Sequence, residues 1–318
     1  MFDICNDSRR VELTVFGVLA QTAALIAFGA AWRALKPWGV DPNTARRVLS
    51  GLVYVLFLPA LVLDVLWRAP LGADALRVAT VAAIGVVAGL TAGWGWYRVR
   101  PSPRGSTGAL LLAAAFGNVT YLGLPVLESA FGPWARSVAI QYDLFACTPL
   151  LLTVGILVAR AHGRSEDAEH PLLGLAKVPA LWSALAAVGL GAFHVPIPDP
   201  VGDGLGRLAG GVVPLMLISI GLALEWPKDW AERMPAVVPV LLIRFLIAPL
   251  VVWGAAGLVG LHGDLLGAVV LEAAMPSMVL GVVICDRYGL DTARYAMTVT
   301  ASTLASVVVL PVWHYLIV

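Results

Sequence analysis

The sequence predicts an all-α membrane protein with ten transmembrane helices in a 5+5 inverted repeat, in which helices four and nine are interrupted. Three observations predict this fold class. Of the 318 residues, 59% are hydrophobic and only 13% are charged, whereas soluble domains are about half apolar and a quarter charged. The apolar residues form runs of about 20 residues, which is the length of a helix that crosses a bilayer. The third observation is a pair of breaks in corresponding runs.

Ten apolar runs are separated by charged residues and by clusters of proline and glycine. An even number of spans places both termini on the same side of the membrane. The predicted spans cover residues 11–34, 46–67, 74–97, 106–131, 134–160, 171–193, 204–225, 234–260, 264–287 and 291–317.

Lysine and arginine are unequally divided between the two sides of the predicted membrane. The side that holds the termini carries six of them, the opposite side carries fourteen, and Arg244 lies inside a span. Because cytoplasmic loops retain the excess of positive charge, the side with fourteen is predicted to be cytoplasmic. We therefore expect an integral inner (plasma) membrane protein with both termini non-cytoplasmic. A net charge of +1 gives no sign of a nucleic acid partner.

The longest polar connection divides the chain into two halves. A charged cytoplasmic linker at 162–170 separates a first five-helix repeat, 1–161, from a second, 171–318. Because five is an odd number, the second half enters the membrane from the opposite side, as in an inverted repeat. Similar features recur in the same order in the two halves: Phe131-Gly132 before Ala135-Arg136 matches Tyr288-Gly289 before Ala293-Arg294, and Pro59 matches Pro214.

Spans four and nine each contain residues that interrupt a helix. These residues lie in AFGNVTYLGLPVLESAFG (115–132) and VVLEAAMPSMVLGVVICDRYG (269–289). Proline removes an N–H and crowds the carbonyl one turn back, so backbone groups lose their partners where lipid supplies none. Paired breaks in inverted halves are typical of a transporter's binding site, where the N-termini of half-helices present N–H groups to an anion. The alternative is a proline kink whose freed groups a neighbouring helix satisfies.

The predicted substrate-binding residues lie in these two breaks. Glycine permits unwinding and close approach, and asparagine, threonine and serine supply side-chain donors and acceptors. The predicted set is Gly117, Asn118, Thr120, Gly123, Pro125, Met275, Pro276 and Ser277.

Three segments resemble the auxin efflux carrier family, which includes bacterial malonate and malate permeases and plant PIN-FORMED carriers. They are GNVTYLGLPV (117–126), VVPLMLISIGLAL (212–224) and AAMPSMVLGVVICDRYGLDTARYAMTVTASTLASVVVLPVW (273–313). The resemblance implies the fold of the bile-acid sodium symporters, in which helices four and nine cross at the substrate site. It implies a scaffold of helices 1, 2, 6 and 7, a moving transport domain of helices 3–5 and 8–10, and the option of a homodimer. Many relatives have asparagine where this chain has Leu280.

Three ionisable residues lie well inside the predicted spans, where charge is costly and usually functional. Asp143 and Arg244 share a depth in spans five and eight, so we expect them to pair, either to fix helix packing or to gate an anion or respond to protons. Glu272 lies four residues before Pro276, and the resemblance implies a sodium ligand at the like position. Na⁺ and H⁺ both suit such a carboxylate, and a protonated glutamate bonded to a neighbouring helix is the alternative.

The sequence contains no P-loop, G-x-S-x-G or H-E-x-x-H motif, and its three cysteines lack metal-ligand spacing, so we predict that it is not an enzyme. The predicted function is secondary active transport of a small organic anion, such as a carboxylate, a dicarboxylate or an auxin-like acid, by elevator-type alternating access. The expected partners are this substrate and the lipid bilayer, and Na⁺ or H⁺ is the coupling ion. The alternative is an ion channel or a non-transporting ligand sensor of the same fold.

Overall fold

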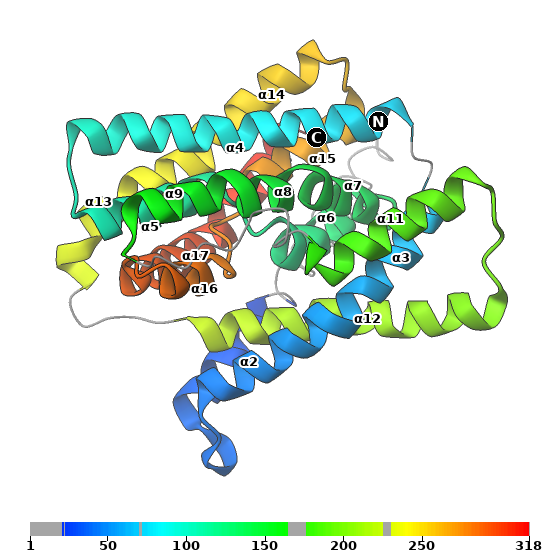
Figure 1. Cartoon of the computed structure of the whole chain (residues 1–318), viewed down its shortest axis with the longest axis horizontal. Coiled ribbons are helices and arrows are strands. Elements are labelled where there is room, and N and C mark those ends of the chain that lie inside the picture. The colour runs from blue at the N-terminus through cyan, green and yellow to red at the C-terminus, as the bar shows by residue number, and fades with distance from the viewer. Residues whose placement is uncertain (1–20, 22, 70–71, 165–175, 225–229, 318) are drawn as a thin grey trace, which may run out of the picture.

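The computed structural model describes residues 21, 23–69, 72–164, 176–224 and 230–317, and over these residues the chain is helical without strands (Figure 1). Among these described residues, six helices are long and apolar enough, by length and composition, to cross a membrane. They cover Pro42–Arg68, Ala73–Val99, Ala135–His162, Asp199–Ala223, Trp230–Leu258 and Thr292–Ile317. Shorter apolar helices cover Ala23–Leu35, Val119–Phe131 and Pro179–Ala192.

The α-helical segments follow one another along the chain, and several long helices consist of more than one of them. The first half contains α2 (Pro42–Leu52), α3 (Leu58–Arg68), α4 (Ala73–Val99), α5 (Arg104–Ala115), α6 (Leu124–Phe131), α7 (Ala135–Tyr142), α8 (Thr148–Leu150) and α9 (Ile156–His162). The second half contains α11 (Pro179–Ala192), α12 (Asp199–Ala223), α13 (Trp230–Leu242), α14 (Ala248–Leu258), α15 (Gly263–Ala273), α16 (Gly281–Arg287) and α17 (Thr292–Ile317).

The prediction of an all-helical membrane protein is confirmed. Predicted spans four and nine are each divided in two, into α5 and α6 and into α15 and α16. Predicted spans one and six lie partly outside the described residues, as does most of the predicted linker at 162–170. The ten-span inverted repeat therefore stays a prediction.

In the described part of the chain, five π-helical turns adjoin α-helical segments, at Val53–Phe57, Val119–Gly123, Asp143–Cys147, Leu151–Gly155 and Ile243–Ile247. Four of them are followed by a proline at the second residue of the next α-helix: Pro59, Pro125, Pro149 and Pro249. Proline has no N–H to donate and its ring crowds the preceding turn, and a widened turn accommodates both. These prolines therefore reshape their helices and do not end them.

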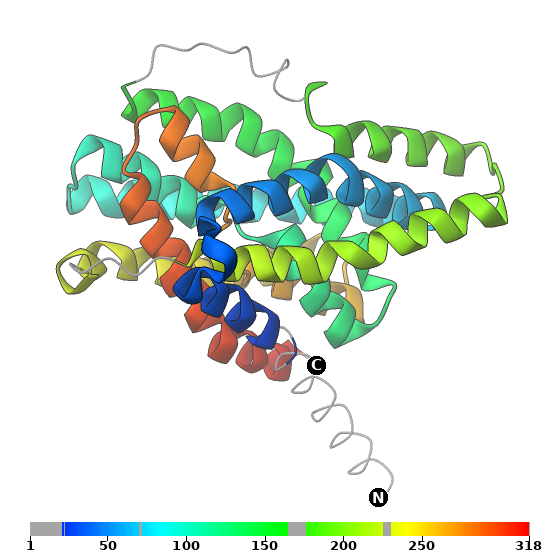
Figure 2. The same ribbon diagram turned by 90° about the horizontal axis from the view of Figure 1, so that it is seen from below.

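The helices pack as two groups. Helices α2, α3, α11 and α12 contact one another, and they lie together in Figures 1 and 2. The other group centres on α5, which is buried from Gly108 to Ala115 and contacts α4, α9, α13 and α17. The main contacts between the groups join α12 to Val119–Gly123, α3 to α7, and α11 to Asp143–Cys147. Both breaks belong to the second group, and residues of the first break lie on the boundary.

Candidate functional site

The two interrupted segments lie side by side and pair through their backbones. Residues 116–118, after α5, and residues 274–280, after α15, are not helical. The N–H of Asn118 donates to the carbonyl of Pro276 at 2.7 Å, and the N–H of Met278 donates to the carbonyl of Phe116 at 3.0 Å. Gly117 and Ser277 thus form an antiparallel bridge. Each break supplies hydrogen-bond partners that the other break needs.

Arg244 supplies further donors to both breaks. Its Nε and Nη2 donate to the carbonyl of Met275 at 3.0 and 2.7 Å, and its Nη1 donates to the carbonyl of Ala115 at 3.3 Å. Ala115 ends α5 and Met275 lies just after α15, so the guanidinium stands at two helix C-termini. A cation at this position stabilises the negative end of a helix dipole. Arg244 is only 3% exposed.

Other side chains satisfy the remaining carbonyls around the breaks. The Oγ of Ser277 donates to the carbonyl of Ala113 at 2.9 Å, and the N–H of Ser277 donates to the Oγ of Ser302 at 3.1 Å. The hydroxyl of Tyr295 donates to the carbonyl of Met278 at 2.9 Å. Protein groups therefore meet most of the hydrogen-bonding demand that the interruptions create, as burial in a membrane requires.

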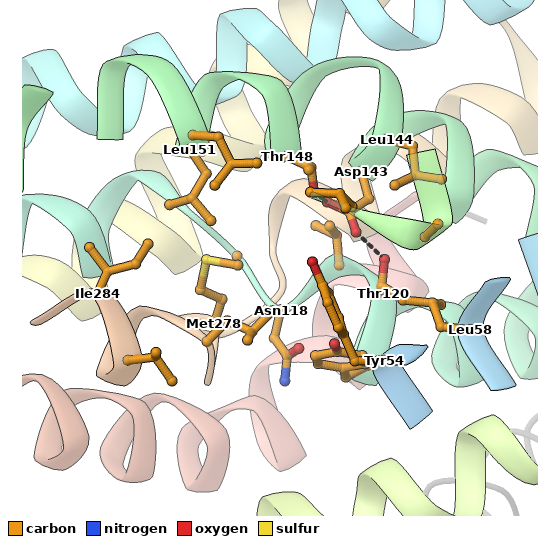
Figure 3. A pocket seen from close by; sticks show the side chains of 18 residues that line it. Tyr54, Leu58, Asn118, Thr120, Asp143, Leu144, Thr148, Leu151, Met278 and Ile284 are labelled. Atoms are coloured by element: carbon orange, nitrogen blue, oxygen red, sulfur yellow. Dashed lines mark hydrogen bonds between the residues drawn. The ribbon is translucent and has the colours of Figure 1, made fainter. Parts of the chain in front are cut away.

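A cavity of about 240 Å³ lies beside the first break. Figure 3 shows Asn118, Thr120, Asp143 and Thr148 around it, and the apolar side chains of Met278, Leu151 and Ile284 on the side away from Asp143. Tyr54 and Leu58, from the other group of helices, complete the wall. The end with Met278, Leu151 and Ile284 is therefore apolar, whereas the end with Asp143 and Thr120 is mixed, because Leu58 and Leu144 lie beside them. The cavity lies between the two groups.

Asp143 is fixed at the mixed end of the cavity by two hydroxyl groups. Thr120, just after the first break, donates to its Oδ2, and Thr148, at the start of α8, donates to its Oδ1 at 2.8 Å. Among the described residues, no lysine, arginine or histidine lines this cavity. Its electrostatic character is therefore set by one carboxyl group and several neutral donors and acceptors.

Gly117, in the first break, and Gly123, at the end of the π-helical turn that follows it, make room for charged side chains. A Cβ at Gly117 would collide with the guanidinium of Arg244, and a Cβ at Gly123 would collide with the carboxyl group of Glu272. Both positions require glycine because of this close approach. The sequence predicted close approach at these glycines, but it did not show which side chains occupy the space.

Two buried polar side chains near the breaks lack partners. Among the described residues, no group hydrogen-bonds the Nδ2 of Asn118 or either carboxyl oxygen of Glu272. Asn118 is 2% exposed and Glu272 is fully buried. In Figure 3 the amide of Asn118 points away from Asp143. Unsatisfied buried polar groups are costly, so a ligand, an ion or a proton at these groups would be stabilising.

The structure separates the predicted site residues into two sets. Gly117, Asn118, Thr120 and Asp143 line the cavity. The other seven are buried around the breaks and do not line the cavity: Gly123, Pro125, Arg244, Glu272, Met275, Pro276 and Ser277. The predicted pair of Asp143 and Arg244 is not formed, because their hydrogen bonds go to the two threonines and to the two backbone carbonyls.

Sequence reasoning did not find Tyr54, Tyr121, Thr148 and Met278, which also line the cavity. Three of them lie in or just after a π-helical turn. In each of these three cases, a proline lies six residues after the first residue of the π-helical turn. This proline is the sequence signal that could have located Tyr54, Tyr121 and Thr148. Periodicity alone does not reveal it, because the turn adds a residue to the helical repeat.

A family profile and several individual relatives match this chain, and all of them are transporters or carriers by their descriptions. The profile of the family described as Membrane transport protein matches residues 14–314. An uncharacterized transporter of Methanothermobacter thermautotrophicus is 30% identical over 282 residues, covering 88% of this chain and 91% of the relative. The uncharacterized transporter YfdV of Escherichia coli K12 is 23% identical over 281 residues, covering 85% and 88%. Auxin efflux carrier component 3a of Oryza sativa is 28% identical over 174 residues, covering 54% of this chain and 26% of the carrier.

Proposed function

Because the chain belongs to the membrane transport protein family, which includes the auxin efflux carriers, we propose that it is a secondary active transporter of a small organic anion. The observation that carries this proposal is the cavity beside the paired breaks. Asn118 and Thr120 line it from the first break and the turn that follows, and Asp143 lines it from the next helix. The substrate occupies this cavity. The N–H groups of Val119, Thr120 and Tyr121, in the first turn after the break, have no acceptor within their own helix and can face its carboxylate.

The division of the cavity into two ends indicates the shape of the substrate. Polar groups at one end suit a carboxylate, and Met278, Leu151 and Ile284 at the other suit an apolar body. A dicarboxylate would place its second charge among these apolar side chains, which is costly. We therefore favour a monocarboxylic acid with an apolar body over malonate or malate.

The charge of Asp143 requires a coupling ion. Two carboxylates in one low-dielectric cavity repel each other strongly. No basic side chain among the described lining residues offsets this repulsion, so we propose that a proton joins Asp143 when the anion binds. Glu272, fully buried with both oxygens unpartnered, is a second position for a proton or for Na⁺.

The cavity is directed toward the arginine-rich side of the predicted membrane. Its walls include Thr148, Leu151 and Leu152, which follow Asp143 in the chain. They also include four residues from the end of the second break and the start of α16: Met278, Leu280, Val283 and Ile284. Both stretches run toward that side in the predicted topology, and Val178 at the start of α11 lines the same end. In this proposal the structure is an inward-facing state, and α4–α9 with α13–α17 move past α2, α3, α11 and α12 to reach the outward-facing state.

Counterflow in proteoliposomes tests the proposal. Vesicles loaded with unlabelled indole-3-acetate should take up labelled indole-3-acetate faster than labelled malonate or malate, and an imposed pH gradient should drive net accumulation. Asn118→Ala should reduce exchange at least tenfold, whereas Asn43→Ala, at the start of α2 and outside the cavity, should not. Undiminished exchange in Asn118→Ala would refute the site assignment.

The same vesicles separate the carrier from its alternatives. A channel would pass current that does not saturate with substrate, and a sensor would bind substrate without exchanging it. Accumulation driven by a sodium gradient at constant pH would replace the proton with Na⁺ as the coupling ion.

A further inference from the structure

A second hollow lies on the outer surface of the helix group that contains the breaks. It has a volume of about 410 Å³, and α4, α5 and the helix that ends in α9 form its walls. Leu90, Trp94, Leu111, Val154, Leu157 and Val158 line it. We call this hollow the α4–α9 groove; Figure 1 shows α4 and α9 close together in that view, with α5 near them. Its walls are mainly apolar, with Thr91 and His162 as the polar lining residues, and Trp94 and Leu157 are each 55% exposed.

Two arginines stand at one end of the groove. The guanidinium of Arg98 lies over the ring of Trp94, with its Cζ 4.9 Å from the ring centroid. Arg104 donates from Nε and Nη2 to the carbonyl of Ala161, another lining residue, at 2.9 and 2.6 Å. This is the end where α4 and α9 finish and α5 begins. The groove therefore joins a long apolar floor to a basic rim.

We propose that the α4–α9 groove binds an anionic phospholipid, with an acyl chain along the groove and the phosphate beside Arg98 and Arg104. Apolar side chains match the acyl chain, and guanidinium groups recognise phosphate through charge and paired N–H donors. A tryptophan at the level of the headgroups is typical of a membrane interface. A zwitterionic lipid such as phosphatidylcholine offers the same phosphate but offsets its charge with a cationic headgroup, so the two arginines favour a lipid with net negative charge.

Native mass spectrometry of the full-length protein in detergent tests this site. With equal amounts of phosphatidylglycerol and phosphatidylcholine added, the protein should retain phosphatidylglycerol in preference. The variant Arg98→Gln/Arg104→Gln should lose this preference about tenfold, which is the scale of attraction between one or two arginines and an anionic lipid surface. Arg77→Gln removes an exposed arginine near the other end of α4 and should leave the preference unchanged.

A second variant tests the floor of the groove without altering charge. Val154→Trp fills the hollow and should reduce retention of both lipids, whereas Val251→Trp, at a different outer hollow between α4 and α14, should not. Equal retention of the two lipids by the unaltered protein would overturn the proposal, and so would a preference that persists in the double arginine variant. Cross-linking of two copies through Leu157→Cys in membranes would assign the groove to a protein interface, which also overturns it.

Discussion

At the scale of single residues, the proposed protonation of Asp143 would explain how a cavity with no basic side chain among its described lining residues binds an anion. Its carboxyl group faces the cavity and is held by Thr120 and Thr148. In the proposed mechanism, a proton on this group removes the repulsion between the two carboxylates when substrate binds. Asparagine has nearly the same shape and is permanently neutral, so it imitates the protonated carboxyl group. Its Nδ2 donates a hydrogen bond where Asp143 accepts one, and the threonine hydroxyl at that position then accepts it.

We therefore expect Asp143→Asn to retain counterflow but lose accumulation driven by a pH gradient. In the unaltered protein a gradient of one pH unit supports at most about tenfold accumulation for one coupled proton. The variant should reach only the equilibrium level. Asp74→Asn changes an exposed carboxylate that pairs with Arg77 near the start of α4, and it should accumulate substrate normally. Normal accumulation in Asp143→Asn would move the coupling role to another residue.

Gly123 tests whether Glu272 lies against the first break. The added methyl group of Gly123→Ala would meet the Glu272 carboxyl group, and overpacking of this kind costs about 1–3 kcal/mol. The variant should unfold at a lower temperature and exchange substrate more slowly. Gly95→Ala in α4 places a methyl group where nothing lies within 4 Å, so its stability should stay level or rise.

A double-mutant cycle completes this test. Glu272→Ala removes the group that the new methyl would strike, so Gly123→Ala should be less destabilising in that background. Additive changes in the free energy of unfolding would show that the two residues do not touch.

At the scale of helical elements, Arg244 holds the paired breaks together because one guanidinium reaches both Ala115 and Met275. Lysine carries the same charge on a compact ammonium and lacks the planar fork. Arg244→Lys should therefore weaken the pairing of the two segments. The amides of Asn118 and Met278, which form that pairing, should lose protection from hydrogen exchange.

Loss of such buried hydrogen bonds costs about 1–3 kcal/mol, so exchange should accelerate roughly tenfold or more. Hydrogen-exchange mass spectrometry of peptides covering 112–120 and 274–282 measures it. Arg136→Lys alters an arginine that pairs with Glu128 between α6 and α7, and it should leave these peptides protected. Unchanged protection in Arg244→Lys would show that the breaks pair without the guanidinium.

The sequence predicted where the helices break but not what the breaks look like. Apolar runs and the helix-breaking residues located both interruptions approximately, because hydrophobic length and the missing N–H of proline are local properties. Pro276 lies in the second break, whereas Pro125 lies in α6, beyond the first break at 116–118. The partners are not local. Arg244 lies in a different span from the two carbonyls to which it donates hydrogen bonds. The π-helical turn at Asp143–Cys147 also changes which residues face the same side of the helix, and a regular 3.6-residue period does not predict this change. Depth alone suggested that Asp143 and Arg244 pair, and the structure assigns each to other partners.

At the scale of the whole molecule, the cavity lies on a boundary between two groups of helices. Tyr54 and Leu58 belong to one group, and Asn118, Asp143 and Leu144 belong to the other. Each group is internally well packed, and the main contacts between them are confined to a few segments. This arrangement permits one group to slide past the other while carrying the paired breaks and the substrate as a unit.

A cross-link over this boundary should therefore stop transport without abolishing binding. The cross-link is made by a short bismaleimide between the two cysteines of the variant Leu58→Cys/Leu144→Cys, in a background where the native cysteines are replaced. It joins the two groups across the cavity wall. Phe57→Cys/Gly211→Cys provides the matched control. A Cβ at Gly211 would touch the ring of Phe57, and both residues lie within the group of α2, α3, α11 and α12.

If the groups move as rigid bodies, the first pair should lose exchange after cross-linking and still bind labelled substrate, while the control pair exchanges normally. Full exchange in the first pair would show that substrate crosses by local gating inside a fixed framework. Loss of exchange in both pairs would show that movement is not confined to the boundary.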